Sequence, residues 1–145
     1  MSASDRDAAE RLLEEVFAPW VQDLGLSVER VGQGTATLRM RFSERLCRDN
    51  GVVCGQALMS LADTAMVFAV AAAAGGYGPM TTVDQTVHFL RPIAKADALA
   101  EARVTRLGRT MAFGQVSITA EGDPRPVATA QTAYALLGER SPAKA

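Results

Sequence analysis

A single acid stands in the middle of an alanine-rich apolar stretch, GVVCGQALMSLADTAM at residues 51–66. The acid is Asp63, and the apolar spacing around it predicts a buried helix over about residues 54–74. A carboxylate in an apolar cleft can act as a general base or as a nucleophile. It can instead be a structural group paired with an arginine, such as Arg39 or Arg91. From the residues alone, both interpretations are open.

The other polar residues of this helix lie close to the acid. Gln56, Ser60, Asp63 and Thr64 follow one another at spacings of four, three and one, which places them in one narrow stripe. Beyond Thr64 the helix is apolar up to the Gly-Gly pair at 75–76, which is typical of a helix C-terminus. Because the stripe is too narrow for a solvent-exposed face, we expect it to line a cleft or a subunit contact.

A glycine, Gly55, lies near the start of the same helix. The first N–H groups of a helix have no intrahelical acceptor, and the helix dipole adds partial positive charge there. Since glycine has no side chain to block a substrate, the Gly55 amide is a candidate donor to an oxyanion. The alternative is a glycine that only joins a loop to a helix.

The spacing of these two residues predicts an oligomer. Gly55 and Asp63 are eight residues apart, or about 12 Å along a helix that rises about 1.5 Å per residue. A reacting carbonyl has to lie within about 3 Å of both the oxyanion donor and the attacking group, so one helix cannot supply both. Two antiparallel copies can, if Gly55 of one chain faces Asp63 of the other. We therefore predict an active unit that is at least a homodimer.

The elements that position these residues predict an α+β fold. A helical apolar stripe comes first, and strands with alternating apolar and polar residues flank the long helix on both sides along the chain. Consecutive hairpins form an antiparallel sheet, and a helix buried on nearly all sides requires a sheet that curls around it. The predicted elements are a helix at 5–18, strands at 26–31 and 35–42, a loop at 43–53, the long helix at 54–74, and strands at 80–91, 98–107, 110–120 and 126–137.

The composition is that of one globular domain. The chain has 145 residues, of which 48% are hydrophobic and 21% charged, and its net charge is −1. This balance lacks the basic footprint of a nucleic-acid-binding protein. The one histidine, His88, and the two cysteines, Cys47 and Cys54, do not have the spacing of a zinc site. We therefore expect neither a nucleic-acid partner nor a metal.

Two segments bear on the location of the protein. Residues 1–17 carry acids and lack the basic-then-apolar order of a signal peptide. The run at 57–76 is long enough to raise the question of a membrane span, but Asp63 at its centre would cost roughly 2.5–3.5 kcal/mol on insertion. We expect a core helix in a cytoplasmic protein with reduced thiols and no membrane partner.

Three stretches of the chain resemble hotdog-fold acyl-CoA thioesterases of the phenylacetate-pathway (PaaI-like) branch. GVVCGQALMSLADTAM resembles the signature G-x-x-H-G-G-x-x-x-x-L-x-D; TTVDQTVHFLRPI (81–93) resembles the next strand, which typically ends in F-L-R-P; and ARVTRLGRTMAFGQVSI (102–118) resembles the following hairpin. The predicted element order fits the hotdog fold, with an extra N-terminal helix. We expect an N-terminal helical segment at 1–24, a thioesterase-like domain at 25–137 and a flexible tail at 138–145.

The resemblance implies hydrolysis of an acyl-CoA thioester without a cofactor. Asp63 falls on the catalytic acid of the family, as general base or nucleophile, and Gly55 falls on its oxyanion amide. Thr82 aligns with a hydroxyl residue that in some members helps to hold the attacking water. We expect a homodimer that assembles into a homotetramer.

The motif departs from the family pattern at three positions. Cys54 replaces the usual histidine, Gln56 replaces the second glycine, and Arg48 replaces an asparagine that some members carry. Loss of one oxyanion donor can cost about 10²–10³ in rate, so we expect slow activity or an unusual acyl group. Cys54 is either a small apolar replacement, a weak donor, or a nucleophile activated by the helix N-terminus.

Arginines near the predicted cleft are candidates for binding the phosphates of coenzyme A. Arg91 lies at a strand end, and Arg106 and Arg109 lie at a hairpin turn. We assign them to substrate binding together with Gln56, the alternative being that they are solvated. Phe89 and its neighbour Leu90 are expected in the core.

Three functions are compatible with these residues. The first is a thioesterase for a small, medium-chain or aromatic acyl-CoA. The second is a non-catalytic acyl-CoA-binding or sensing protein on the same fold, because the CGQ sequence at 54–56 departs from the signature. The third is a hydratase or dehydratase, which usually needs a histidine with an acid in the cleft. His88 lies well after the long helix and is expected to face away from Val87 and Phe89, so we place this function last.

Overall fold

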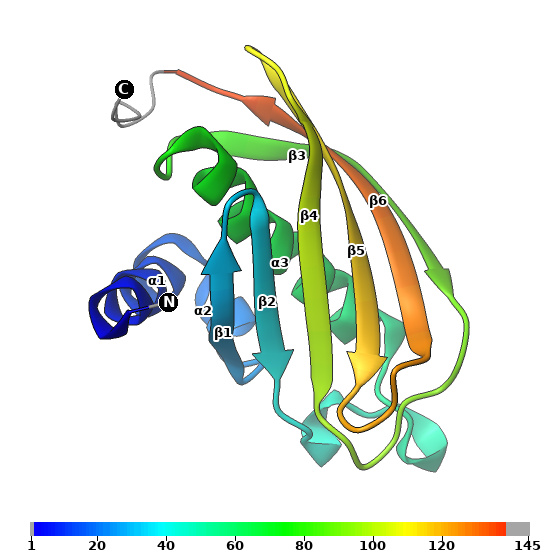
Figure 1. The fold of residues 1–145 in the computed structure, drawn as a ribbon. Coiled ribbons are helices and arrows are strands. Elements are labelled where there is room, and N and C mark those ends of the chain that lie inside the picture. The colour runs from blue at the N-terminus through cyan, green and yellow to red at the C-terminus, as the bar shows by residue number, and fades with distance from the viewer. Residues whose placement is uncertain (1, 139–145) are drawn as a thin grey trace.

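The computed structural model describes residues 2–138 as one long helix wrapped by a six-stranded antiparallel sheet (Figure 1). The strand order is β1-β2-β4-β5-β6-β3, so β1 and β3 form the two edges. The α-helices are α1 (Ala3–Val16), α2 (Pro19–Gln22) and α3 (Gly55–Ala74), and the strands are β1 (Leu26–Gly32), β2 (Thr35–Met40), β3 (Met80–Phe89), β4 (Ala98–Leu107), β5 (Met111–Ala120) and β6 (Pro126–Leu136).

The predicted α+β architecture with a long central helix is confirmed. Each predicted strand corresponds to an observed one, and most ends agree within two residues. The predicted loop at 43–53 contains two short 3₁₀ turns, Glu44–Leu46 and Asp49–Gly51. All of the predicted tail except Gly138 falls outside the described residues.

Helix α3 is the core of the molecule. It ends at Gly75, whose φ of 81° is the left-handed conformation that glycine adopts most easily, and the Gly75 N–H caps the carbonyls of Ala71 and Ala72. By length and composition α3 could cross a membrane, but 67% of its most apolar window is buried in the fold. This burial identifies α3 as a core helix, as expected.

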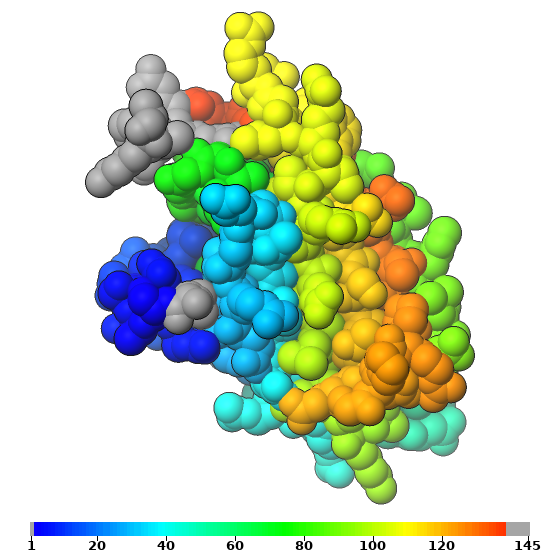
Figure 2. Space-filling view, in the orientation of Figure 1, coloured from blue at the N-terminus to red at the C-terminus, as the bar shows by residue number. Residues whose placement is uncertain are grey.

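Small residues on the sheet let α3 approach closely. The alanines that face α3 from β2, β4 and β5 are buried, namely Ala36, Ala98, Ala100, Ala102 and Ala112. At Gly114 a Cβ would overlap the Met66 side chain and lie 2.8 Å from the Arg103 carbonyl oxygen. Because interiors pack at near-crystalline density, this contact tolerates little increase in volume. Figure 2 shows the opposite face of the sheet as a continuous front surface that hides most of α3.

The N-terminal helices pack beside β1 (Figure 1). A capping box between Ser2 and Asp5 starts α1 earlier than the predicted residue 5. Helix α1 ends at Val16. A second short helix, α2, begins with Pro19 at its first position, where proline is favoured. Arg6 donates to the Val28 carbonyl at 2.8 Å, so α1 is tied to the sheet edge.

Candidate active site

Asp63 lies midway along α3 and is held by two hydroxyl groups from the sheet. Thr82 Oγ1, on β3, donates to Asp63 Oδ1 at 2.8 Å. The Tyr134 hydroxyl, on β6, lies 3.0 Å from the Asp63 carbonyl oxygen and closer still to Oδ1. Within residues 2–138, Oδ2 has no hydrogen-bond partner. One oxygen of the carboxylate is therefore fixed and the other is unengaged.

No arginine neutralises this carboxylate in the described part of the chain. Arg39 instead forms ion pairs with Glu29, with Asp97 at 2.8 Å and with Glu121. These pairs raise the pKa of Arg39, chiefly through the hydrogen bond to Glu29. The alternative that Asp63 is the structural partner of Arg39 is therefore wrong.

A β-bulge turns Thr82 toward the helix. Thr82 pairs with Tyr134 and Asp84 pairs with Ala133, so Val83 is the extra residue of β3. Strand residues alternate between faces, and the bulge resets this alternation. In a regular strand, Thr82 and Gln85 would face opposite sides because they are three positions apart. With the bulge both face α3: Thr82 donates to Asp63, and Gln85 Nε2 donates to the Met59 carbonyl at 3.0 Å.

Tyr134 is a site residue that the sequence interpretation missed. It is 1% exposed. Burial raises its pKa, and the charge of Asp63 and the hydrogen bond to it raise the pKa further, so the phenol stays protonated as a donor. The sequence did carry a signal for it: Tyr134 lies on the same face of β6 as the buried Ala130 and Thr132. A tyrosine that faces a core needs a hydrogen-bond partner for its hydroxyl.

The N-terminus of α3 forms a second cluster of interest. Cys54 is the N-cap residue and makes no side-chain capping bond. The Gly55 N–H has no acceptor in the described structure, as expected for the first residue of a helix. A Cβ at Gly55 would lie 3.1 Å from Cζ of the Phe89 ring, so the ring lies directly against this glycine.

A cavity of about 500 Å³ opens at this helix end. Its walls are mostly apolar with two guanidinium groups, and they comprise Arg48, Val52, Val53, Gly55, Leu58, Phe89, Leu90, Arg91, Pro92 and Ile93. Phe89 and Leu90 are 50% and 52% exposed, so the expectation that they are core residues is wrong. Both line the cavity instead, beside the candidate oxyanion amide.

Comparisons with known proteins assign this chain to a family. Residues 50–127 match the model of the thioesterase superfamily. An inferred esterase of Halobacterium salinarum is 31% identical over 150 residues, which cover 92% of this chain and 96% of that protein. This chain belongs to the thioesterase superfamily.

Solved structures agree with this assignment. An inferred thioesterase from Silicibacter is 32% identical, with a TM-score of 0.81 and coverage of 92% of both chains. The phenylacetic acid degradation protein PaaI of Thermus thermophilus is 26% identical, with a TM-score of 0.73 and coverage of 83% of this chain and 100% of that one. The E. coli PaaI protein, at 22% identity, shares the fold, with a TM-score of 0.80 over 92% and 94% of the two chains. The resemblance to hotdog-fold thioesterases is confirmed, and the chain is a hydrolase of the thioester-cleaving class.

The arginines predicted to bind substrate fall at two places in this thioesterase. Arg91 lines the cavity at the start of α3. Arg106 and Arg109 lie at the β4–β5 hairpin, at the opposite end of the sheet (Figure 1). Within one protomer the structure does not bring the two groups together. Gln56 is exposed on the first turn of α3.

The polar stripe of α3 is only partly a cleft lining. The Ser60 hydroxyl donates to the Gln56 carbonyl at 2.9 Å, and the Thr64 hydroxyl donates to the Ser60 carbonyl at 2.7 Å. Thr64 is buried, contrary to the expectation that the whole stripe lines a cleft or a subunit contact. These hydroxyl groups are satisfied by their own helix, which leaves Asp63 as the distinctive group of the stripe.

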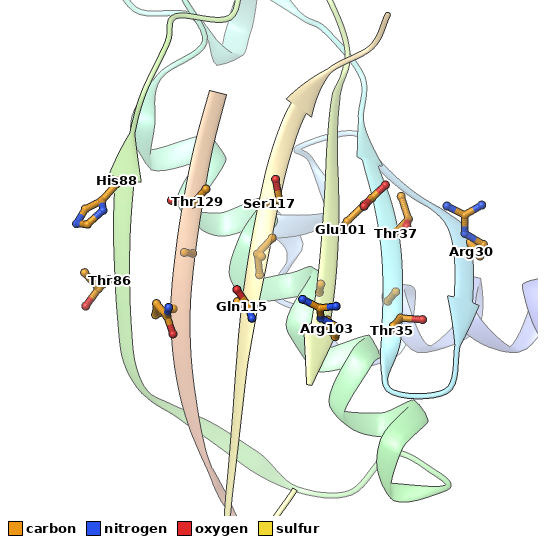
Figure 3. Close-up of a pocket in the computed structure, with 15 residues that line it drawn as sticks. Arg30, Thr35, Thr37, Thr86, His88, Glu101, Arg103, Gln115, Ser117 and Thr129 are labelled. Carbon is orange, nitrogen blue, oxygen red and sulfur yellow. The ribbon is translucent and has the colours of Figure 1, made fainter. Parts of the chain in front are cut away.

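A larger depression, of about 710 Å³, lies on the sheet face that points away from α3. Figure 3 shows His88 and Thr86 of β3 with Gln115, Ser117 and Arg103 on this face. His88 thus faces away from Phe89, as expected, and is on the other side of the sheet from Asp63. No cluster of metal-ligating side chains occurs among the described residues.

Proposed function

We propose that this protein hydrolyses the thioester of a small, medium-chain or aromatic acyl-CoA, with Asp63 and Gly55 acting in sites shared between two chains. The observation that carries the proposal is the state of Asp63: its carboxylate has one oxygen held by hydroxyl groups and the other free of any described partner. A carboxylate whose second oxygen makes no bond within the protein is available to a substrate or a water, which an acid in an ion pair with arginine is not. Membership of the thioesterase superfamily supplies the reaction class.

The reaction assigns a role to each end of α3. The Gly55 N–H donates to the thioester oxygen as negative charge develops on it, aided by the helix dipole. Asp63 either takes a proton from a water whose oxygen attacks the carbonyl carbon, or attacks that carbon itself to form an anhydride that water then hydrolyses. In both routes the carbon–sulfur bond breaks, and the thiolate of coenzyme A leaves and takes up a proton.

The other predicted residues surround this centre. Thr82 holds Asp63 through Oδ1, and in this proposal its hydroxyl also helps to hold the attacking water. Cys54 contributes at most a weak donor to the thioester carbonyl, so we propose a slower reaction than a motif histidine would give. The coenzyme A portion is bound by the three arginines and by Gln56 at the start of α3. The arginines are Arg91 of one chain together with Arg106 and Arg109.

The dimer in this proposal forms through β3. This strand is an edge of the sheet, so one side of its backbone is unpaired, and such an edge is a template for pairing with another chain. Val83 is 59% exposed, and Met59, Phe89 and Leu90 are also exposed apolar residues on or near this edge. Antiparallel pairing of β3 with its copy would bring two α3 helices side by side. We propose that two such dimers form a tetramer and that the enzyme is cytoplasmic.

A second candidate function is acyl-CoA binding without turnover. It is favoured by one observation: Cys54, at the position of the motif histidine, makes no capping bond and is a poor hydrogen-bond donor. A site with a weakened oxyanion hole can hold an acyl-CoA and still hydrolyse it too slowly to matter.

The first experiment follows thiol release from short, medium and aromatic acyl-CoAs. Wild type is compared with Asp63→Asn and with Asp7→Asn, a matched control that makes the same change at an exposed position of α1, away from the proposed dimer edge. We expect turnover to fall by at least about 10³-fold in Asp63→Asn and to be unchanged in the control. Equal turnover in Asp63→Asn and wild type would remove Asp63 from the mechanism, and binding without turnover for every substrate would favour the second function.

The second experiment tests the shared site by mixing two inactive chains. Co-refolded Asp63→Asn and Gly55→Ala chains form mixed dimers in which one site has both wild-type residues and the other has neither. Random pairing makes half of the dimers mixed, so activity should return to about a quarter of the wild-type level. If each site lies within one chain, mixing restores nothing.

A further inference from the structure

The two hydroxyl groups that reach Asp63 converge on the same oxygen. Thr82 and Tyr134 are directly opposite each other on β3 and β6, and both contact Oδ1. The last torsion of an aspartate side chain is broad and has few intrinsic preferences. Two donors on one oxygen therefore restrict the plane of the carboxylate far more than packing against a helix face would.

We propose, on the basis of the function proposed above, that Tyr134 is a positioning residue of thioester hydrolysis, which holds Asp63 Oδ1 so that Oδ2 is the oxygen that acts on the substrate or its water. Tyr134 does not touch the substrate in this proposal. It acts through Asp63, and it does so from a buried position on the inner face of the sheet, where its ring cannot change rotamer freely.

The geometry favours Tyr134 over Thr82 as the stronger constraint. Thr82 lies on an exposed edge strand, whereas Tyr134 is on β6, paired with β5 on one side and β3 on the other. The phenol has one proton, and its shorter contact is with Oδ1 rather than with the Asp63 carbonyl. The second contact, at 3.0 Å from the Asp63 carbonyl oxygen, places the phenol oxygen beside the backbone of α3.

Few other ionisable groups face this carboxylate. From β6 the facing group is Tyr134, and from β3 it is the non-ionisable Thr82. Asp84 pairs with Ala133, on the other face of the sheet from Tyr134. On α3 itself Asp63 is the one charged residue between Gly55 and Ala74. A change in the ionisation of Asp63 on removal of the phenol is therefore attributable to the lost hydrogen bond.

The alternative is that Tyr134 is only a core tyrosine whose hydroxyl is satisfied by a helix carbonyl. Both roles predict some loss of stability in Tyr134→Phe. Only the positioning role predicts that the acidic limb of the pH–rate profile moves, because a hydroxyl donor favours the charged form of a carboxylate. Tyr77→Phe is the matched control, since Tyr77 makes no side-chain hydrogen bond to a described residue.

The experiment measures kcat, KM and the pH–rate profile of wild type, Tyr134→Phe, Tyr77→Phe and Asp63→Asn. In Tyr134→Phe we expect kcat to fall about 10- to 100-fold with KM nearly unchanged, and the acidic limb to move up by about one pH unit. Tyr77→Phe should match wild type in both. In parallel, NMR of isotope-labelled aspartate carboxyls follows the signal that is lost in Asp63→Asn, and its titration should move in the same direction in Tyr134→Phe.

The outcomes separate the two proposals. If wild type is active, Asp63→Asn is inactive, and Tyr134→Phe keeps the wild-type kcat and acidic limb, the positioning role is wrong and the proposed function stands. If wild type hydrolyses no acyl-CoA, both fall. If Tyr134→Phe does not fold, wild-type NMR decides: a slowly exchanging tyrosine hydroxyl proton that disappears in Asp63→Asn supports the bond to Oδ1, and an unchanged hydroxyl signal overturns it.

Discussion

Replacement of Gly55 by alanine separates the oxyanion role of this residue from its role in folding. The backbone at Gly55 is not in the left-handed region, so alanine fits its conformation. Because Gly55 is the first residue of α3, alanine gains only part of the roughly 1 kcal/mol by which it is favoured over glycine in a helix interior. Against this gain, the new Cβ would lie 3.1 Å from Cζ of Phe89. That atom is the far end of a half-exposed side chain, so a small rotation relieves the contact. We expect the free energy of unfolding to change by less than about 1 kcal/mol.

The effect on hydrolysis should be far larger. The methyl group would project into the cavity beside the free N–H, where a thioester oxygen has to come within about 3 Å. Alanine keeps the backbone N–H, so the substitution acts by blocking the approach of the thioester oxygen to this donor. We expect kcat to fall by up to about 10²–10³, or about 2.7–4 kcal/mol in transition-state stabilisation. The assay is thiol release under saturating acyl-CoA, with thermal unfolding of the same samples. A stable Gly55→Ala protein with wild-type kcat would refute the close approach of the thioester oxygen to the N–H at Gly55, on which the prediction rests.

A double variant tests whether any loss arises from displacement of Phe89 instead. Phe89→Leu alone and Gly55→Ala/Phe89→Leu complete a mutant cycle. If the amide is the donor, the double variant stays as slow as Gly55→Ala. If the methyl group acts by pushing the ring, the smaller leucine restores most of the activity, which would contradict our interpretation.

Two further predictions concern the helix cap and acid stability. Cys54→Ser places a good capping side chain at an N-cap that makes no capping bond, so it should raise the free energy of unfolding by about 1 kcal/mol in urea denaturation. It should also keep kcat within about tenfold, whereas loss of a nucleophilic thiol would abolish turnover. The hydrogen bond from the Phe42 N–H, and then Arg39, lower the pKa of Asp97 in the folded protein. Its stabilisation is therefore present above the unfolded value of about pH 3.9 and is lost as the pH falls below it. Asp97→Asn should be less stable at neutral pH by about 1–2 kcal/mol and lose less stability on acidification, and parallel urea curves for both proteins at every pH would contradict this.

From the sequence alone, relative positions could be predicted only for those candidate site residues that lie on one element. Asp63 and Gly55 share a helix whose period is fixed, so their separation follows from counting residues. The contact between Thr82 and Tyr134 could not be predicted in this way, because it depends on a bulge at Val83 that resets the alternation of β3. No feature of the TTVDQT sequence signals this extra residue. It is recognised only from the shift in the pairing of β3 with β6.

Phe89 and Leu90 illustrate a second limit of pattern reasoning. Their apolar side chains suggest a core position, and a strand that crosses the middle of the sheet would have buried them. Because β3 is an edge strand that ends at Phe89, both side chains lie over the helix N-terminus instead. Edge or centre is set by the order of strands in space, which is not the order along the chain.

The alanine-lined contact between α3 and the sheet has a consequence for how this protein can change over evolutionary time. Helix α3 packs on small sheet residues, namely Ala36, Ala100, Ala102 and Gly114, and the interface leaves hardly any room for larger side chains. Part of the cavity wall, by contrast, lies at the surface. Arg48, Phe89 and Leu90 are exposed, whereas Ile93 of the same wall belongs to the core. New side chains at these exposed wall positions would not disturb the seat of the helix, so the shape of the cavity can change while the architecture stays intact.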